Sequence, residues 1–255
     1  MAESVCAECG GSGWKIIERD GVTGAERCAC ALTVRTAELE AESGIPPKFQ
    51  HASFDNFVLP PDNPIAHAAL GQVLIYVKGY ARQFPVTDKP GLLLVGDVTG
   101  TGKTHLAVAA FRAILAKGFA GVFFDFSNLL DRIRKSYDVA SGITDREAYR
   151  TALDAEVLLL DDLGSQRGTE WVQDTVTSLI TYRYNHQKPL IATTNMPDPD
   201  AGSNVVERSE HMPGRVDYRT TLADAIGARA RSRLFEMCKV VRMPQVEDYR
   251  IRRMR

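Results

Sequence analysis

A glycine-rich run that ends in lysine and threonine, residues 96–104, lies between an apolar segment and a segment of helical composition. Glycines let backbone N–H groups close around phosphate oxygens, and the start of a helix adds a positive dipole. Lys103 would reach the β- and γ-phosphates, and the Thr104 hydroxyl would hold Mg²⁺. We therefore predict an ATP and Mg²⁺ site whose loop is formed by Gly100, Thr101, Gly102, Lys103 and Thr104.

The first half of this loop departs from the usual spacing. The common pattern has a glycine six positions before the lysine; this chain has Asp97 there, and the glycine lies one residue earlier, at Gly96. The spacing indicates a one-residue insertion, which we expect to alter the loop without abolishing binding. A glycine-rich turn beside a chance lysine is the weaker alternative, because an expected strand and helix flank the run.

Polar side chains end two later apolar segments. Asp161 and Asp162 follow residues 157–160, and Asn195 follows residues 190–194. Ligands bind beyond the carboxyl ends of parallel strands, so Asp161 suits the Mg²⁺ shell and Asp162 suits orienting or deprotonating an attacking water. Asn195 would hold that water or the γ-phosphate. The alternative for all three is a role in strand-end turns.

Three arginines lie within five residues, at Arg229, Arg231 and Arg233. Arg229 and Arg233 are four apart and share a helix face. Such a face can supply an arginine finger to the ATP of a neighbouring subunit, where it stabilises charge in the transition state. Arg233 is the favoured finger, and a solvated basic face is the alternative.

Four of the five cysteines lie in the first 30 residues, as the pairs Cys6 with Cys9 and Cys28 with Cys30. Two close pairs of thiolates match the four ligands of tetrahedral Zn²⁺, although the second pair is spaced more tightly than usual. The segment around them has too little apolar content to fold without a crosslink such as a structural metal ion. Unliganded thiols and an iron–sulfur cluster are the alternatives. Cys238 precedes an apolar run and is expected in the core.

The segments between these motifs alternate between apolar runs and amphipathic stretches, which indicates an α/β fold with a parallel sheet covered on both faces. We expect a module with a linker helix at residues 1–43, an ATPase domain at 44–255, and a polar, mobile loop at 197–220. The expected strands are 91–95, 121–124, 157–160, 190–194 and 239–243, and the expected helices are 65–84, 104–116, 128–137, 145–154, 170–186 and 222–236.

The composition is that of a globular protein. The chain has 255 residues, 44% hydrophobic and 25% charged, and a net charge of −1, so nucleic-acid binding would need a local basic patch. It has no apolar run long enough to span a membrane and no N-terminal signal pattern. We therefore expect a cytoplasmic protein without a membrane partner, in a compartment where thiols stay reduced.

Together these motifs resemble those of AAA+ ATPases, and more narrowly the DnaC/DnaI-type helicase loaders. The resemblance rests on segments 45–50, 54–57, 102–107, 160–164, 194–195 and 231–234. It implies a P-loop core with a five-stranded parallel sheet, no C-terminal helical lid, His105 within the nucleotide site, and ATP held between protomers that self-associate. It also implies an N-terminal zinc module that grips the hexameric helicase.

The same resemblance implies that ATP binding and slow hydrolysis to ADP and phosphate switch a factor that loads the replicative helicase onto single-stranded DNA. The helix after the second strand would contact DNA through Arg132, Arg134, Lys135 and Tyr137, which offer charge and one stacking surface; a solvated basic face is the alternative. The alternative function is a transposition helper of the IstB type, which shares the ATPase core, binds duplex DNA and recruits a transposase.

Overall fold

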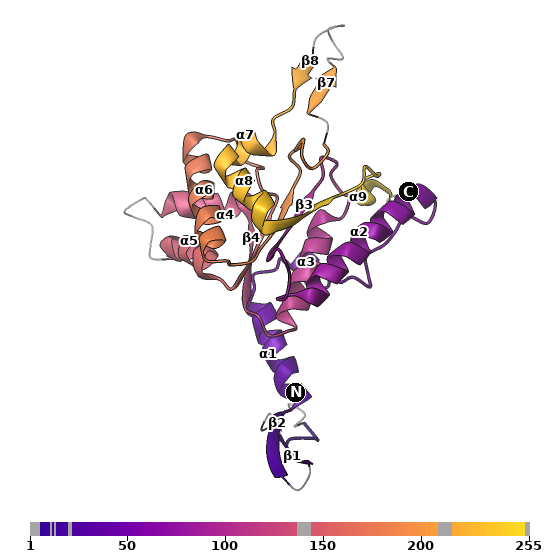
Figure 1. The fold of residues 1–255 in the computed structure, drawn as a ribbon, viewed down its shortest axis with the longest axis vertical. Coiled ribbons are helices and arrows are strands. Elements are labelled where there is room, and N and C mark those ends of the chain that lie inside the picture. The colour runs from indigo at the N-terminus through magenta and orange to yellow at the C-terminus, as the bar shows by residue number, and fades with distance from the viewer. Residues whose placement is uncertain are drawn as a thin grey trace.

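Figure 1 shows a central sheet between two layers of helices, with one small element at each end of the long axis. The computed structural model describes residues 6–10, 12, 14–19, 22–136, 144–203, 205–208 and 216–252. No helix among these residues is long and apolar enough to cross a membrane.

The central sheet has five strands in the order β4-β5-β6-β3-β9. All four neighbouring pairs are parallel, which confirms the predicted parallel sheet. Because every strand runs the same way, the carboxyl ends of the strands meet at one edge. The strands are β3 Gly91–Val95, β4 Gly121–Asp125, β5 Val157–Asp161, β6 Leu190–Thr194 and β9 Cys238–Arg242.

Alternate residues of each strand face opposite layers. In β3, Leu93 and Val95 pack into one core, and Leu92 and Leu94 pack into the other. The Leu92 core is covered by α2 and α3, and the Leu93 core is covered by α4 to α8. The helices are α2 Pro64–Gln83, α3 Lys103–Leu115, α4 Phe126–Lys135, α5 Thr144–Asp154, α6 Glu170–Asn185, α7 Leu222–Ile226 and α8 Ala228–Met237.

Local sequence signals explain where several helices begin. The Asn63 side chain accepts a hydrogen bond from the Ala66 N–H, and Pro64 occupies the first turn of α2. Thr169 caps α6 in the same way. Each cap satisfies a backbone donor that has no partner within its own helix.

Two sequence predictions are wrong in the C-terminal half. The single helix expected over 222–236 is broken at Gly227, where φ is +87°, into α7 and α8. The segment 197–220, expected as a loop, contains an antiparallel pair of strands, β7 Val206–Arg208 and β8 Val216–Tyr218. Figure 1 shows this pair projecting away from the core, beyond the edge where α7 lies.

At the other end of the molecule, the hairpin of β1 Trp14–Arg19 and β2 Val22–Arg27 leads into α1 Ala29–Glu42. The C-terminal end of α1 packs on the core. Leu39 is buried there, Arg112 of α3 donates two hydrogen bonds to the Glu40 carboxylate, and the Phe123 N–H donates to the Ser43 carbonyl oxygen. A short 3₁₀ helix η1, Pro47–Phe49, follows.

The chain after β9 contains one further helix among the described residues, α9 Tyr249–Arg252. Figure 1 shows the segment before α9 running back along the carboxyl edge of the sheet, close to the loop between β3 and α3.

Candidate nucleotide site and metal centre

The loop between β3 and α3 forms around the buried side chain of Lys103. The Lys103 Nζ donates hydrogen bonds to the carbonyl oxygens of Gly96 and Val98, each at 2.7 Å. Burial lowers the pKa of Lys103 to about 8, although the charges of Asp162 and Asp97 oppose this. A buried ammonium held by carbonyl oxygens and facing carboxylates is well placed to accept an anion such as a phosphate.

Two positions of the loop require glycine. At Gly102, φ is +95° and a Cβ would lie 2.5 Å from Cε2 of Phe57; at Gly100, φ is +67° and a Cβ would lie 1.8 Å from Oδ1 of Asp248. A side chain at either position would be strained and would clash. The loop is therefore shaped by two residues far from it in the sequence, Phe57 before it and Asp248 after it.

Thr104 and Asp161 lie together, as the sequence predicted. The Thr104 hydroxyl donates to the Asp161 carboxylate, with Oγ1 at 3.0 Å from Oδ1 and 3.1 Å from Oδ2. Burial raises the pKa of Asp161, hydrogen bonds from Thr193 and Thr104 lower it, and the charge of Asp162 raises it again. A hydroxyl beside a half-buried carboxylate fits Mg²⁺, because a divalent cation would offset the cost of taking this charge partly out of water.

Asp162 and Asn195 are also brought together. The Thr193 hydroxyl donates to Asp161, the Asp162 N–H donates to Thr193 Oγ1, and Asn195 Nδ2 donates to Asp162 Oδ1 at 2.6 Å. Asp162 has φ of +58°, which is uncommon for a residue other than glycine. The Asn195 Oδ1 is buried and has no hydrogen-bond partner, so it is left as an acceptor for a water or ligand.

His105 lies on the side of the loop where the segment before α2 crosses it. Its Nε2 is 2.9 Å from the Ser53 carbonyl oxygen, and its ring centroid is 5.4 Å from that of Phe57. Phe57 thus contacts both Gly102 and His105. This places an aromatic ring of the 45–57 segment beside the phosphate loop.

Sequence reasoning missed two segments that contact the loop. The C-terminal segment follows it, because the Met243 N–H donates to the Val95 carbonyl and the Tyr249 N–H donates to the Gly100 carbonyl. Asp97, in the first half of the loop, forms an ion pair with Arg219, with Nη1 and Oδ2 2.7 Å apart. No local pattern in the sequence links residues so far apart.

The comparisons with known proteins agree with this geometry. A family model described as "IstB-like ATP binding protein" matches residues 78–206, just over half of the chain. The chain belongs to this ATP-binding family. The loop around Lys103 is therefore the candidate ATP site of this chain.

Relatives of this IstB-like chain include YqaM, an uncharacterized protein of Bacillus subtilis (strain 168). It is 27% identical over 198 residues, which are 75% of this chain and 59% of YqaM. The chain thus spans less than two thirds of that relative. The replicative helicase loader DnaC of Escherichia coli (strain K12) is 23% identical over 208 residues, which are 76% of this chain and 77% of DnaC.

Solved structures give the same picture. A crystal structure of the DnaC helicase loader is 30% identical, with a TM-score of 0.59, and the match covers 78% of this chain and all of that one. The crystal structure of DnaI has a TM-score of 0.57 at 16% identity, covering 83% of this chain and 99% of that one, and shows the shared fold alone. The predicted AAA+ fold is confirmed.

In this IstB-like chain the three arginines of α8 have different environments. Arg231 is held within the chain by Asp198 and Asp200, at 2.6 Å and 2.5 Å, and lies over the Phe235 ring. Arg229 is exposed, and the half-buried Arg233 donates to the Arg229 carbonyl at 3.4 Å. Arg231 therefore has a structural role, and Arg233 as an arginine finger stays a prediction.

The predicted DNA-binding helix is α4. Its buried face is formed by Phe126, Leu129, Leu130 and Ile133. On the rest of the helix, Arg132 lies over the Phe124 ring and Arg134 lies over the Trp171 ring, at 5.7 Å and 4.7 Å from the centroids. Lys135 is exposed, and Tyr137 lies outside the described residues. Arg132 also lines a cavity of about 450 Å³ between α1, β4, α4 and α5.

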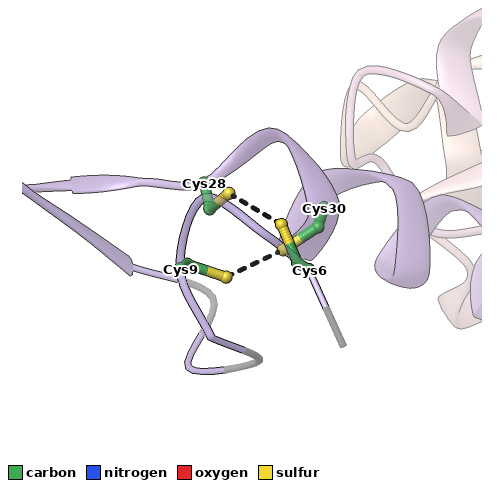
Figure 2. A group of neighbouring side chains, drawn as sticks. All are labelled: Cys6, Cys9, Cys28 and Cys30. Carbon is green, nitrogen blue, oxygen red and sulfur yellow. Dashed lines mark hydrogen bonds between the residues drawn. The ribbon is translucent and has the colours of Figure 1, made fainter. Parts of the chain in front are cut away.

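The four predicted zinc ligands converge. Figure 2 shows the four sulfur atoms pointing toward one another, from the turn after Cys6 and from the start of α1. The Sγ atoms of Cys6 and Cys28 are 3.8 Å apart, those of Cys9 and Cys30 are 3.2 Å apart, and all four lie within 4.8 Å of one another. None of the four is in a disulfide.

This cluster fits tetrahedral Zn²⁺. A Zn–S bond of about 2.3 Å requires sulfur atoms about 3.8 Å apart, close to the separations observed. The hydrogen bonds with the neighbouring thiols of Cys9 and Cys28 raise the pKa of Cys30 to about 12. Four thiolates could therefore share this space only around a cation.

Proposed function

We propose that this chain is an ATP-dependent loader that places a replicative hexameric helicase on single-stranded DNA. The observation that supports it most is the match to the DnaC helicase loader structure, at 30% identity over the whole of that chain. The cysteine cluster supports it further, because it gives the chain a separate element, at the far end of α1, with which to hold a partner.

The ATP site supplies the switch in this proposal. Lys103 binds the β- and γ-phosphates, while Thr104 and Asp161 hold Mg²⁺. When bound, Mg²⁺ neutralises charge on the phosphate oxygens. Asp162 and the free carbonyl oxygen of Asn195 orient the attacking water. Self-association would bring Arg233 of one protomer to the ATP of the next and make hydrolysis depend on assembly.

The two partners would bind at different parts of the chain. We infer that Zn²⁺ held by Cys6, Cys9, Cys28 and Cys30 fixes the module that grips the helicase. Arg132, Arg134 and Lys135 of α4 would contact the DNA backbone, with Tyr137 as the predicted stacking residue. The stacking of Arg132 and Arg134 on aromatic rings would hold both guanidinium groups in place for phosphate contacts.

The second candidate is a transposition helper that binds duplex DNA and recruits a transposase. The IstB-like family model favours it, because this model matches residues 78–206. That match lies within the ATPase core, which both kinds of protein share. The cysteine cluster lies outside the matched residues and favours the loader.

Co-purification with the replicative hexameric helicase tests the proposal. The wild-type chain with ATP should retain the helicase, and Cys6→Ser should lose it, because one thiolate of the zinc site is gone. Cys238→Ala is the matched control: Cys238 is buried in the core, far from the cluster in sequence, and this variant should retain the helicase. If the wild-type chain retains no helicase but binds duplex DNA and a transposase, the second candidate replaces the first.

A further inference from the structure

The first half of the phosphate loop contains a carboxylate, Asp97, at a site for a polyanion. The Asp97 side chain is only 12% exposed. Although burial raises the pKa of Asp97, hydrogen bonds from Arg219 and from its own backbone, with the charge of Arg219, lower it below the usual value. Asp97 is therefore charged at neutral pH, and it would repel the phosphates of ATP if it stood alone.

Arg219 cancels this charge. Its Nη1 is 2.7 Å from Asp97 Oδ2, and its side chain is 26% exposed, so water screens the pair only in part. The Gln245 side chain also lowers the pKa of Asp97. The Asp97 carboxylate is thus held by the segment after β8.

The ion pair also connects the loop with the projecting strands. Arg219 directly follows β8, and its N–H donates to the Val205 carbonyl beside β7. The base of the β7–β8 pair is therefore joined to the phosphate loop through one side chain. Asp97 in turn acts electrostatically on Lys103, whose ammonium form it favours.

We propose that Arg219 is a positioning residue for ATP, which holds Asp97 and neutralises its charge so that the enlarged loop can accept the triphosphate. This inference rests on the ATP site of the proposed function. It assigns a role to a residue outside the loop, the acidic strand ends and the arginine helix. It also explains how the loop tolerates an acidic residue six positions before Lys103.

Titration of the full chain with ATP and Mg²⁺ tests this role. Arg219→Ala should weaken ATP binding by about tenfold, because one unpaired carboxylate near the phosphates costs roughly one order of magnitude. Arg219→Ala combined with Asp97→Asn should restore the affinity to within about threefold of wild type, because no charge remains to be cancelled. Arg219→Lys should retain most of the affinity.

The rescue separates electrostatics from folding. A purely structural role of Arg219 would leave the double variant as weak as Arg219→Ala, and this result would overturn the proposal, as would wild-type affinity in Arg219→Ala. Arg82→Ala, which removes an exposed arginine at the end of α2, is the matched control and should bind ATP normally. Failure of the wild-type chain itself to bind ATP would instead contradict the proposed function.

Discussion

The ATP site and the cysteine cluster both gather side chains for a charged ligand, but the chain supports them in opposite ways. In the ATP site the groups are already paired within the protein: Lys103 with two loop carbonyls, Thr104 with Asp161, and Asn195 with Asp162. In the cluster, the sulfur atoms mainly contact one another. The first site is preformed without its ligand, whereas the second has little to hold it together except a ligand.

Burial explains the difference. The strands that carry the ATP site are fully buried, as in Leu92 to Val95 at 0% exposure. Among the side chains described within residues 6–30, only Cys28 is buried, and Trp14 and Ile16 are exposed. A module with so little buried apolar surface cannot offset its conformational entropy, so metal binding and folding should be one event there.

The strongest test of this contrast is removal of zinc. Chelation should unfold the module, because a structural zinc site contributes about 10–16 kcal/mol to folding, and should leave the core unchanged. Limited proteolysis should then cut within residues 6–28 while the melting temperature of the core stays constant. Metal analysis should find one zinc per chain, lost in Cys30→Ser and kept in the matched Cys238→Ala.

Two results would break the comparison. Protein prepared without chelators that contains no zinc would remove the metal centre. A core that melts at a lower temperature after chelation would mean that the two regions are not supported independently.

The ATP site should instead show a pH dependence of binding. Burial lowers the pKa of Lys103 to about 8, and bound phosphates would raise it. Above pH 8 the Lys103 side chain of the free protein has lost a proton, which it must regain when ATP binds. The ATP affinity should therefore fall by up to about tenfold for each unit by which the pH rises. Below pH 8 this contribution is constant. Titrations between pH 8 and pH 10, where ATP is already fully ionised, measure the effect.

Lys103→Arg provides the control for this titration. Its guanidinium stays protonated over the whole range, so its ATP affinity should be independent of pH in that window even if it is weaker overall. A wild-type affinity that is equally flat would show that the Lys103 ammonium is not the group that the phosphates require.

The sequence predicted the positions of the candidate site residues correctly where polar side chains come at the end of an apolar strand. Asp161 and Asn195 lie at or just beyond the carboxyl ends of buried apolar runs, and Lys103 begins the helix after the loop that follows a third such run. A parallel sheet brings these ends together. The four cysteines were predictable for a similar reason, because two close pairs in a segment without a core have few other uses.

The rest depended on contacts that leave no local pattern. Arg219 and Asp97 are separated by 122 positions, and each alone resembles an ordinary surface charge. Strands β7 and β8 have three residues each, which is too short for alternation to be visible. Gly227 interrupts a continuous helical pattern, and only its positive φ identifies the break. The pairing of Arg231 with Asp198 likewise could not be read from spacing.

The smallest predicted effect concerns the connection between the two regions. Glu40 of α1 accepts two hydrogen bonds from Arg112 of α3, with both side chains 30% exposed or less. A bidentate pair of this kind is worth about 1 kcal/mol. Glu40→Gln should therefore lower the unfolding free energy of the core by about that amount, measured by denaturant titration.

The matched control is Glu38→Gln, two residues earlier on the same helix at an exposed position, and it should have no measurable effect. If Glu40→Gln is equally silent, the Glu40–Arg112 pair adds no net stability, and the C-terminal end of α1 is held to the core by Leu39 and by the Ser43–Phe123 hydrogen bond. If it has the expected cost, α1 belongs to the core at its C-terminal end and only the region before it depends on zinc. This result would place the boundary between the region stabilised by the core and the region stabilised by zinc within α1 itself, before Glu40.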